Sequence, residues 1–176
     1  MIALRQERSS DAKAREALLD EAFGDTRNRK TSQRLREGRL PAEGLSLIAA
    51  EGKRVVGTAR LWHVACASGQ TGLMLGPVAV AADCRSRGIG AALVHRALRD
   101  ARRLGYGVII LVGDPPYYGR FGFSSEKTQS VRLPGPFERA RLLAIELKVG
   151  AFEGAQGLIS ATGRAADAAD LAALAA

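Results

Sequence analysis

The turn from Arg85 to Gly90 combines two glycines with two arginines, a combination suited to binding an anion. It follows an apolar segment ending at Val80 and opens an amphipathic segment, so it joins a predicted strand to a predicted helix. Glycines remove side chains and let backbone N–H groups approach a ligand. The unpaired N–H groups and the dipole of a helix N-terminus favour negative charge there. The sequence therefore predicts a pyrophosphate site made of Arg85, Ser86, Arg87, Gly88, Ile89 and Gly90.

The residues of this turn also allow other interpretations. A bare Gly-x-Gly is also compatible with a tight strand-to-helix connection that binds nothing. A Rossmann dinucleotide loop requires a third glycine, and position 93 is Leu. A Walker loop requires Gly-Lys-Ser/Thr, which is absent. The turn alone therefore indicates an anion site without naming its ligand.

The segment Arg85–Gly90 matches the Arg/Gln-x-x-Gly-x-Gly/Ala signature of the GCN5-related N-acetyltransferase (GNAT) superfamily. The preceding Leu75–Val80 resembles the strand before that signature. Gly113–Phe123 resembles the segment in which a tyrosine precedes a Gly-Phe pair by four residues. Leu133–Phe137 is similar to a segment of one bacterial branch, the YhbS-like predicted acetyltransferases. The resemblance is clear over residues 73–123, and the order of elements follows it over nearly the whole chain.

The resemblance implies an α/β (α+β) fold with a mixed, mostly antiparallel twisted sheet. A central pair of parallel strands would splay apart, and helices would flank both faces. The splayed strands would be Leu73–Val80 and Val108–Val112. Pro77 fits such an irregularity, because proline cannot donate a hydrogen bond to a sheet ladder.

The resemblance also implies acetyl-CoA as co-substrate, with no metal. Its pyrophosphate would lie on the turn, and its pantetheine arm would pair with main-chain groups of Val78 and Val80. A free N–H near Val78 or Ala79 would bind the thioester oxygen as it gains charge.

Tyr118 takes the position of the family's usual general acid. An amine would attack the thioester directly in a ternary complex, and the phenol would protonate the departing thiolate. Tyr117 is the alternative acid, and Tyr118 could instead only pack on the cofactor or the core. Thr71–Val80 carries no acid to take the amine's proton, so the base stays open. The candidates are Glu51, His63, Asp114, Glu146 and water.

Hydrophobic periodicity predicts the elements that position these residues. A helix is expected over Asp11–Phe23, with Asp11 as N-cap, and an amphipathic helix over Gly88–Leu104. Short helices are expected at Thr31–Glu37 and after Pro115. One domain should span residues 1–163, and the alanine-rich residues 164–176 should form a helix or a tail. The expected strands are Leu45–Ala50, Arg54–Cys66, Thr71–Val80, Val108–Val112, Leu142–Val149 and Gly157–Ala161.

The 176 residues carry a net charge of +8, which favours an anionic partner. One basic cluster runs from Arg27 to Arg39 and hints at an acidic acceptor. Cys66 and Cys84 have neither a disulfide framework nor the spacing of a zinc site. Met1–Asp11 lacks the apolar core of a secretory signal, and no run is long enough to span a bilayer. A cytoplasmic protein without a membrane partner is therefore expected.

Three classes of function follow from these features. The leading one is an acetyl-CoA-dependent N-acetyltransferase acting on an amine-bearing small molecule, peptide or protein. The second keeps the fold as a non-catalytic acyl-CoA sensor, which the presence of Tyr118 disfavours. The third is a nucleic-acid-binding protein, which is disfavoured because the basic clusters lack interleaved aromatic residues. A homodimer is compatible with the sequence, and the acceptor is not identified by it.

Overall fold

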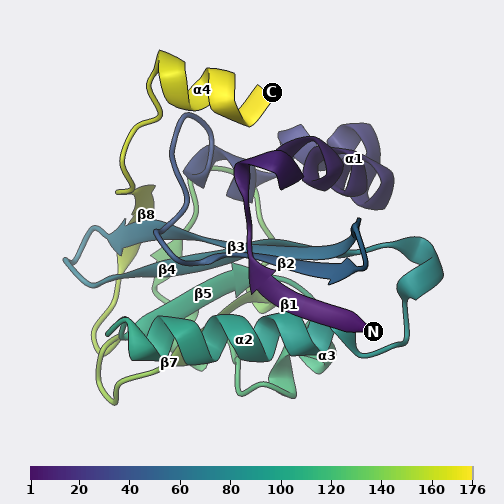
Figure 1. Cartoon of the computed structure of the whole chain (residues 1–176). Helices are drawn as coiled ribbons and strands as arrows, with labels where there is room; N and C mark the ends of the chain where they lie inside the picture. The colour runs from purple at the N-terminus through teal and green to yellow at the C-terminus, as the bar shows by residue number, and fades with distance from the viewer. Residues whose placement is uncertain (176) are drawn as a thin grey trace.

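The computed structural model describes residues 1–175 as one sheet flanked by helices on both faces (Figure 1). The main path of the sheet is β1-β2-β3-β4-β5-β7, and β8 pairs with β3 and with β6. The strands are β1 Ile2–Gln6, β2 Ser46–Glu51, β3 Arg54–Cys66, β4 Thr71–Val80, β5 Val108–Val112, β6 Val131–Arg132, β7 Leu142–Glu146 and β8 Gly157–Ala161. The helices are α1 Ala12–Phe23, α2 Ile89–Arg103, α3 Pro115–Gly119 and α4 Ala168–Ala175.

The predicted fold is confirmed. All pairings along the main path are antiparallel except that of β4 with β5. The two-residue β6 adds a second parallel pairing at the edge, against β8. Helices α1 and α4 lie on one side of the sheet, and α2 and α3 lie on the other (Figure 1). No helix among residues 1–175 is long and apolar enough to cross a membrane.

The parallel strands β4 and β5 are paired over a very short length. Their register joins Leu73 to Ile109 and Met74 to Ile110, and no further pair follows. Beyond this point β4 is irregular at Gly76-Pro77, where its register against β3 shifts. The indole N–H of Trp62 donates to the Gly76 carbonyl at 2.6 Å and fixes the irregular segment to β3. The two strands therefore diverge at their C-terminal ends, as the sequence predicts.

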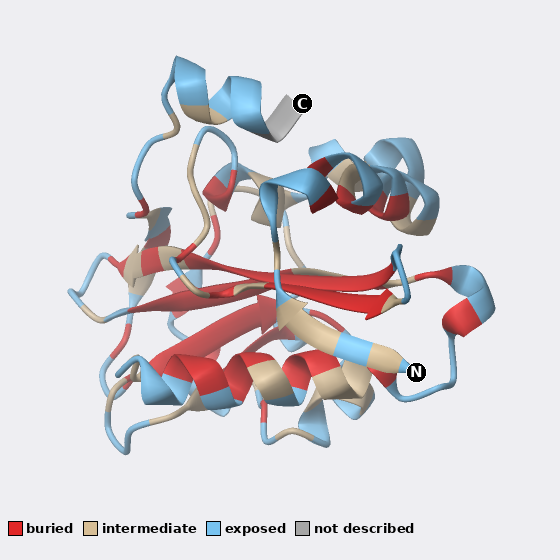
Figure 2. Cartoon of the chain, viewed as in Figure 1, coloured by how far each residue is buried: buried red, intermediate tan, exposed pale blue. Residues whose placement is uncertain are grey.

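The side-chain alternation of β3 separates the face of the sheet covered by α2 from the face on which α1 lies. A Cβ built on Gly57 would lie 3.0 Å from Ile89 and Leu93 of α2, so this residue faces α2. Successive strand residues point to opposite faces. Arg60 and Trp62 consequently face the side on which α1 lies. Figure 2 shows the buried residues concentrated in the sheet and on the inner sides of α1 and α2.

Several local predictions were wrong at the ends of elements. Asp11 does not cap α1, because its carboxylate accepts from the Arg5 guanidinium (2.6 and 2.9 Å) and the Arg8 N–H (2.7 Å). The hydrogen bond from Arg5 contributes most to lowering the pKa of Asp11 to about 2, and the one from the Arg8 N–H adds to it. The strand expected to reach Val149 ends at Glu146, whose carboxylate accepts from backbone N–H groups of the following turn.

Other segments have a type of secondary structure that the sequence did not predict. The helix predicted at Thr31–Glu37 is a 3₁₀ turn over Thr31–Leu35, preceded by another at Gly24–Arg29. Strands β1 and β6 were not predicted from the sequence. The C-terminal segment is helical over Ala168–Ala175, and it is tied down where the Ala166 N–H donates to the Gly38 carbonyl.

Gly72 is required by the close approach of β4 to β5. A Cβ at this position would lie 2.4 Å from Val108 Cγ1 and 2.8 Å from the Val108 carbonyl oxygen. Because the carbonyl is backbone, Gly72→Ala should destabilise the fold by about 1–3 kcal/mol, as overpacked sites do. Chemical denaturation measures the loss. Gly119→Ala is the control, since a Cβ there would meet nothing within 4 Å. Equal stabilities of the two variants would contradict the prediction.

Candidate active site

The turn before α2 is open at Gly88. Gly88 is the N-cap of α2 with φ of 77°, and a Cβ on it would meet nothing within 4 Å. Ser86 also has a positive φ, 61°. Ile89 is buried and anchors the turn in the core, whereas residues 85–88 are exposed. This geometry leaves the first turn of α2 accessible to an anion.

The two arginines of the turn have different surroundings. Arg87 donates to Glu51 at 2.8 Å, and this hydrogen bond lowers the pKa of the Glu51 carboxyl. Arg85 forms no ion pair in the described part of the chain. Glu51, one of the candidate bases, lies at the end of β2, is paired with the turn, and is not among the residues that line the cavity described below.

The backbone of β4 beyond the irregular segment has free groups on one side. The Ala81 N–H donates to the Val56 carbonyl of the neighbouring β3 segment at 2.9 Å. Hydrogen-bonded and non-bonded pairs alternate in antiparallel strands, so Ala79 bonds to β3, while Val78 and Val80 point their N–H and C=O groups away. These groups face the gap left by β5. Of the two residues considered for the oxyanion donor, the alternation favours Val78 over Ala79.

Tyr117 and Tyr118 are neighbours on the short helix α3. The Asp114 carboxylate accepts the Tyr117 N–H at 3.1 Å and caps this helix. The Tyr118 ring lies against Gly113, where a Cβ would come within 2.4 Å of it. Tyr118 lines the cavity, whereas the Tyr117 hydroxyl lies 2.9 Å from the position of a Cβ on Gly90. The two side chains thus contact different parts of the site.

The environment of Tyr118 keeps its phenol neutral. Burial and the neighbouring Tyr117 raise its pKa to about 12, and Arg141 opposes this shift. The rings of Tyr117 and Phe123 pack edge-on against it, with centroids 5.0 and 6.0 Å away. A phenol with this pKa is protonated throughout the neutral pH range.

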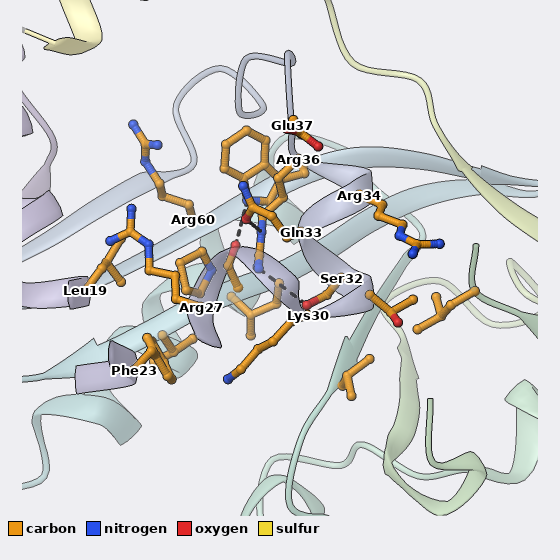
Figure 3. A pocket seen from close by; sticks show the side chains of 18 of the residues that line it. Leu19, Phe23, Arg27, Lys30, Ser32, Gln33, Arg34, Arg36, Glu37 and Arg60 are labelled. Carbon is orange, nitrogen blue, oxygen red and sulfur yellow. Dashed lines mark hydrogen bonds between the residues drawn. The ribbon is translucent and has the colours of Figure 1, made fainter. Parts of the chain in front are cut away.

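A cavity of about 1300 Å³ opens where β4 and β5 diverge (Figure 3). Its walls come from α1, the 3₁₀ turns that follow it, β3, the irregular part of β4, the end of β5, residues 133–141 and the C-terminal segment. Tyr118 and Pro77 both lie on its wall, so the free backbone edge of β4 and the phenol share one space.

The remaining candidate bases lie elsewhere or are already bonded. His63 shares the α2-facing side of β3, with its ring 5.6 Å from that of Tyr106. The Glu146 carboxylate accepts from the Gly150 and Phe152 N–H groups, which, with Lys127, lower its pKa. Asp114 is the one candidate of the four that lines the cavity, and its carboxylate caps α3.

Several cavity residues were missed from the sequence. Arg60 and Trp62 lie on the cavity side of β3, and the strand alternation could have found them. Arg141 and Phe137 come from the irregular segment between β6 and β7, where no periodic signal points to them.

The profile of the acetyltransferase (GNAT) family matches residues 12–123, which include the turn, both diverging strands and Tyr118. The chain therefore belongs to this family of acyltransferases and is an N-acetyltransferase.

Similar proteins extend the comparison over most of the chain. An uncharacterised N-acetyltransferase of Escherichia coli K12, YhbS, is 29% identical over 160 residues, 90% of this chain and 95% of the relative. The crystal structure of E. coli YhbS in complex with CoA matches with a TM-score of 0.78 and 27% identity, covering 92% of this chain and 89% of that one. A GNAT acetyltransferase from Brucella melitensis in complex with acetyl-CoA matches with a TM-score of 0.57 and 27% identity, covering 87% and 99%.

Substitutions of Asp114 test its role as a helix cap. Asp114→Ala should lower stability by about 1 kcal/mol, because it removes an acceptor for an unpaired helix N–H. Asp114→Asn should stay close to the unmodified protein, since the amide oxygen accepts the same N–H. Thermal or chemical denaturation measures both variants. A loss for Asn as large as that for Ala would show that the charge, rather than the cap, carries the stability.

Proposed function

We propose that this chain transfers an acetyl group from acetyl-CoA to a primary amine by direct attack in a ternary complex. The observation that carries the proposal is the cavity at the divergence of β4 and β5, which brings Tyr118 and the irregular strand edge into one space. A donor entering from the turn and an acceptor entering from the cavity could meet there.

The fit of the residues to acetyl-CoA supports the donor. The open glycine turn has the geometry of a pyrophosphate site, with Arg85 exposed beside it. The outward N–H and C=O groups of Val78 and Val80 match an extended arm that carries amides, as an added strand would. The structures of E. coli YhbS with CoA and of the B. melitensis protein with acetyl-CoA make the same co-substrate the natural choice here.

The reaction forms a nitrogen–carbon bond, breaks the carbon–sulfur bond, and moves one proton from the amine and one to the sulfur. Bound acetyl-CoA supplies the activated acyl group. The Val78 N–H is assigned to the thioester oxygen, where such a donor is worth about 3 kcal/mol in the transition state. Tyr118 is assigned as the acid that gives the sulfur its proton and then recovers one from water.

The raised pKa of Tyr118 fits this role only in part. It keeps the acid protonated, but transfer to a thiolate with an ordinary pKa of about 8.5 is then uphill. A thiolate formed in the same buried space is also desolvated, which raises its own pKa and narrows the difference. The proton transfer is therefore assigned to the moment of carbon–sulfur cleavage rather than to a preceding equilibrium.

No general base is assigned, and the cations of the cavity reduce the need for one. Burial, Arg36 and Arg141 lower the pKa of Lys30, an amine at the cavity wall. The same surroundings act on any amine that enters, because burial and like charges disfavour its protonated form. The acceptor then reaches the thioester in the neutral, nucleophilic form more often than it would in water.

Gly88→Ala tests the pyrophosphate site. A Cβ would project into the space assigned to the ligand, so acetyl-CoA affinity should fall about tenfold or more, the cost of weakening hydrogen bonds to a charged group. Gly150→Ala is the matched control, because Gly150 also has a positive φ (81°) and open space around it. Both variants should lose about 1–2 kcal/mol of stability from the left-handed backbone. Calorimetric titration with acetyl-CoA measures affinity, and equal affinities in the two variants would contradict the assignment.

Tyr118→Phe tests the acid. The kcat should fall about 10²–10⁴-fold, with little change in acetyl-CoA affinity, because the lost hydroxyl acts on the leaving sulfur. In the unmodified enzyme, the neutral phenol is the active form. Its raised pKa shifts to higher pH the point at which ionisation of the phenol would lower kcat. Tyr118 should thus cause no decline in kcat between about pH 7 and 10, since its pKa is about 12. An unchanged kcat in the Phe variant would remove the role, and Tyr117→Phe tests the neighbour in the same assay.

A further inference from the structure

The cavity wall is strongly basic. Nine basic side chains line it against four acidic ones, so its field attracts anions. Some of these cations are neutralised within the protein. Arg15 and Arg60 both donate to Glu7, and Arg27 pairs with Glu16 and Asp20. What distinguishes a ligand site from a structural network is a buried cation without a carboxylate partner.

Arg36 is such a cation. Only 9% of its surface is exposed, and it forms no ion pair within the residues that the structure covers. Its Nε donates to the Gln33 amide oxygen at 3.2 Å and its Nη2 to the Ser32 hydroxyl at 3.3 Å (Figure 3). A guanidinium has five N–H groups, so three find no acceptor among the described residues. The other amino nitrogen, Nη1, lies 3.1 Å from the position of a Cβ on Gly76 and so faces the irregular part of β4.

Two further cations act on the same space. The Lys30 ammonium lies 4.3 Å from the centre of the Phe23 ring, and Arg36 and Arg141 both lower its pKa through their charge. Arg141 also acts on Tyr118, so it lies close to the proposed acid. Neither Lys30 nor Arg141 forms an ion pair in the part of the chain that the structure describes.

The acidic side chains of the cavity do not neutralise the charges of Arg36, Lys30 and Arg141. Glu16 already accepts from Arg15 and Arg27. Asp114 caps α3, and Glu37 and Glu138 are exposed. Burying a guanidinium without a counter-charge costs free energy, and desolvation lowers the pKa of Arg36 to about 10. An anionic ligand would offset this cost through charge-assisted hydrogen bonds.

We propose that the acceptor amine carries an anionic oxygen group, a carboxylate or a phosphate, which Arg36 binds together with Lys30 and Arg141. The inference rests on the proposed function for the presence of an amine, but the anion site stands on its own geometry. Arg36 faces Gly76, and the thioester donor is assigned two residues further along β4, a span of at most about 7 Å even for fully extended backbone. A few bonds therefore separate the amine from the anion, as in a short amino acid or an aminoalkyl phosphate.

The anion site is tested first by binding, without turnover. The protein saturated with CoA, which fills the pyrophosphate turn, is titrated with glutarate and separately with inorganic phosphate at constant ionic strength. Each should raise the Tm of the unmodified protein if its group is bound, and the larger shift identifies carboxylate or phosphate. Arg36→Met should lose the shift, and Arg141→Met should reduce it. Arg103→Met, which removes an exposed charge on α2, should keep it.

Arg36→Met also has a distinct effect on the free protein. Replacing a buried cation that lacks a counter-charge with an apolar side chain of similar length should leave Tm unchanged or raise it. A structural guanidinium would instead leave the variant less stable. Equal anion-induced shifts in Arg36→Met and the unmodified protein, or no shift in either, would overturn the proposal.

Turnover is tested with matched amines that differ in the anion. β-Alanine is compared with β-alaninamide, and 2-aminoethyl phosphate with ethanolamine, by following free CoA. The anionic member of at least one pair should have a kcat/KM about tenfold or more higher, and Arg36→Met should abolish the preference. Absence of preference alongside turnover would refute the anion site. Absence of any acetylation, with the anion shifts intact, would refute the proposed function instead.

Discussion

The short pairing between β4 and β5 is the constraint on which the rest of the site depends. These strands share register at only two positions, and the irregular Gly76-Pro77 segment then turns β4 away. A regular parallel pair would satisfy its backbone groups internally. Divergence leaves those of Val78 and Val80 for a ligand and opens the cavity between the strands. The Trp62 indole N–H, bonded to the Gly76 carbonyl, ties this irregularity to a strand paired along its whole length.

The cavity face is fixed by a chain of contacts that begins at the N-terminus. Glu7, just after β1, accepts from Arg15 of α1 and from Arg60 of β3. The Arg60 guanidinium in turn lies 5.6 Å from the centre of the Trp62 ring. Helix α1 is therefore held against the sheet through the same residues that support the irregular strand. These arginines are satisfied within the protein, whereas Arg36, Lys30 and Arg141 line the same cavity and form no ion pair with a described residue.

Much of the fold could be predicted from the sequence, because its central elements have strong periodicity. Strands β3, β4, β5 and β8 have the predicted bounds, and α2 agrees to within one residue at each end. The features that the sequence did not predict are either very short elements or contacts made only in the tertiary fold. The five residues of β1 gain their pairing from β2, and the two of β6 carry no pattern. Asp11 has the residue type of a cap, but Arg5, six positions earlier, takes its carboxylate.

Part of the site was predictable because it is formed by local motifs. These motifs, the glycine turn and the segment around Tyr118, pointed to residues that follow the C-terminal ends of the two diverging strands. The sequence also showed that residues 27–39 are basic, but it could not distinguish Arg27, which is paired, from Arg36, which is buried and unpaired. That difference depends on the tertiary fold, which brings the carboxylates of Glu16 and Asp20 to Arg27 and no carboxylate of a described residue to Arg36. Arg141 is more than one hundred residues from Arg36 in sequence, and only the tertiary fold brings both to one cavity.

The absence of an acid on β4 becomes intelligible when the charges of the cavity are considered together. Burial, and after it the charges of Arg36 and Arg141, lower the pKa of Lys30, and the same surroundings disfavour a protonated acceptor amine, which reduces the need for a base. The same field would repel a simple cationic acceptor during entry. An acceptor whose carboxylate or phosphate is bound by Arg36 avoids this conflict, because its anion offsets the field that would repel the molecule, while burial still disfavours the protonated form of its amine. The missing base and the unpaired Arg36 are then two consequences of one charge distribution, and an acceptor that satisfies both is a short molecule with an amine and an anion.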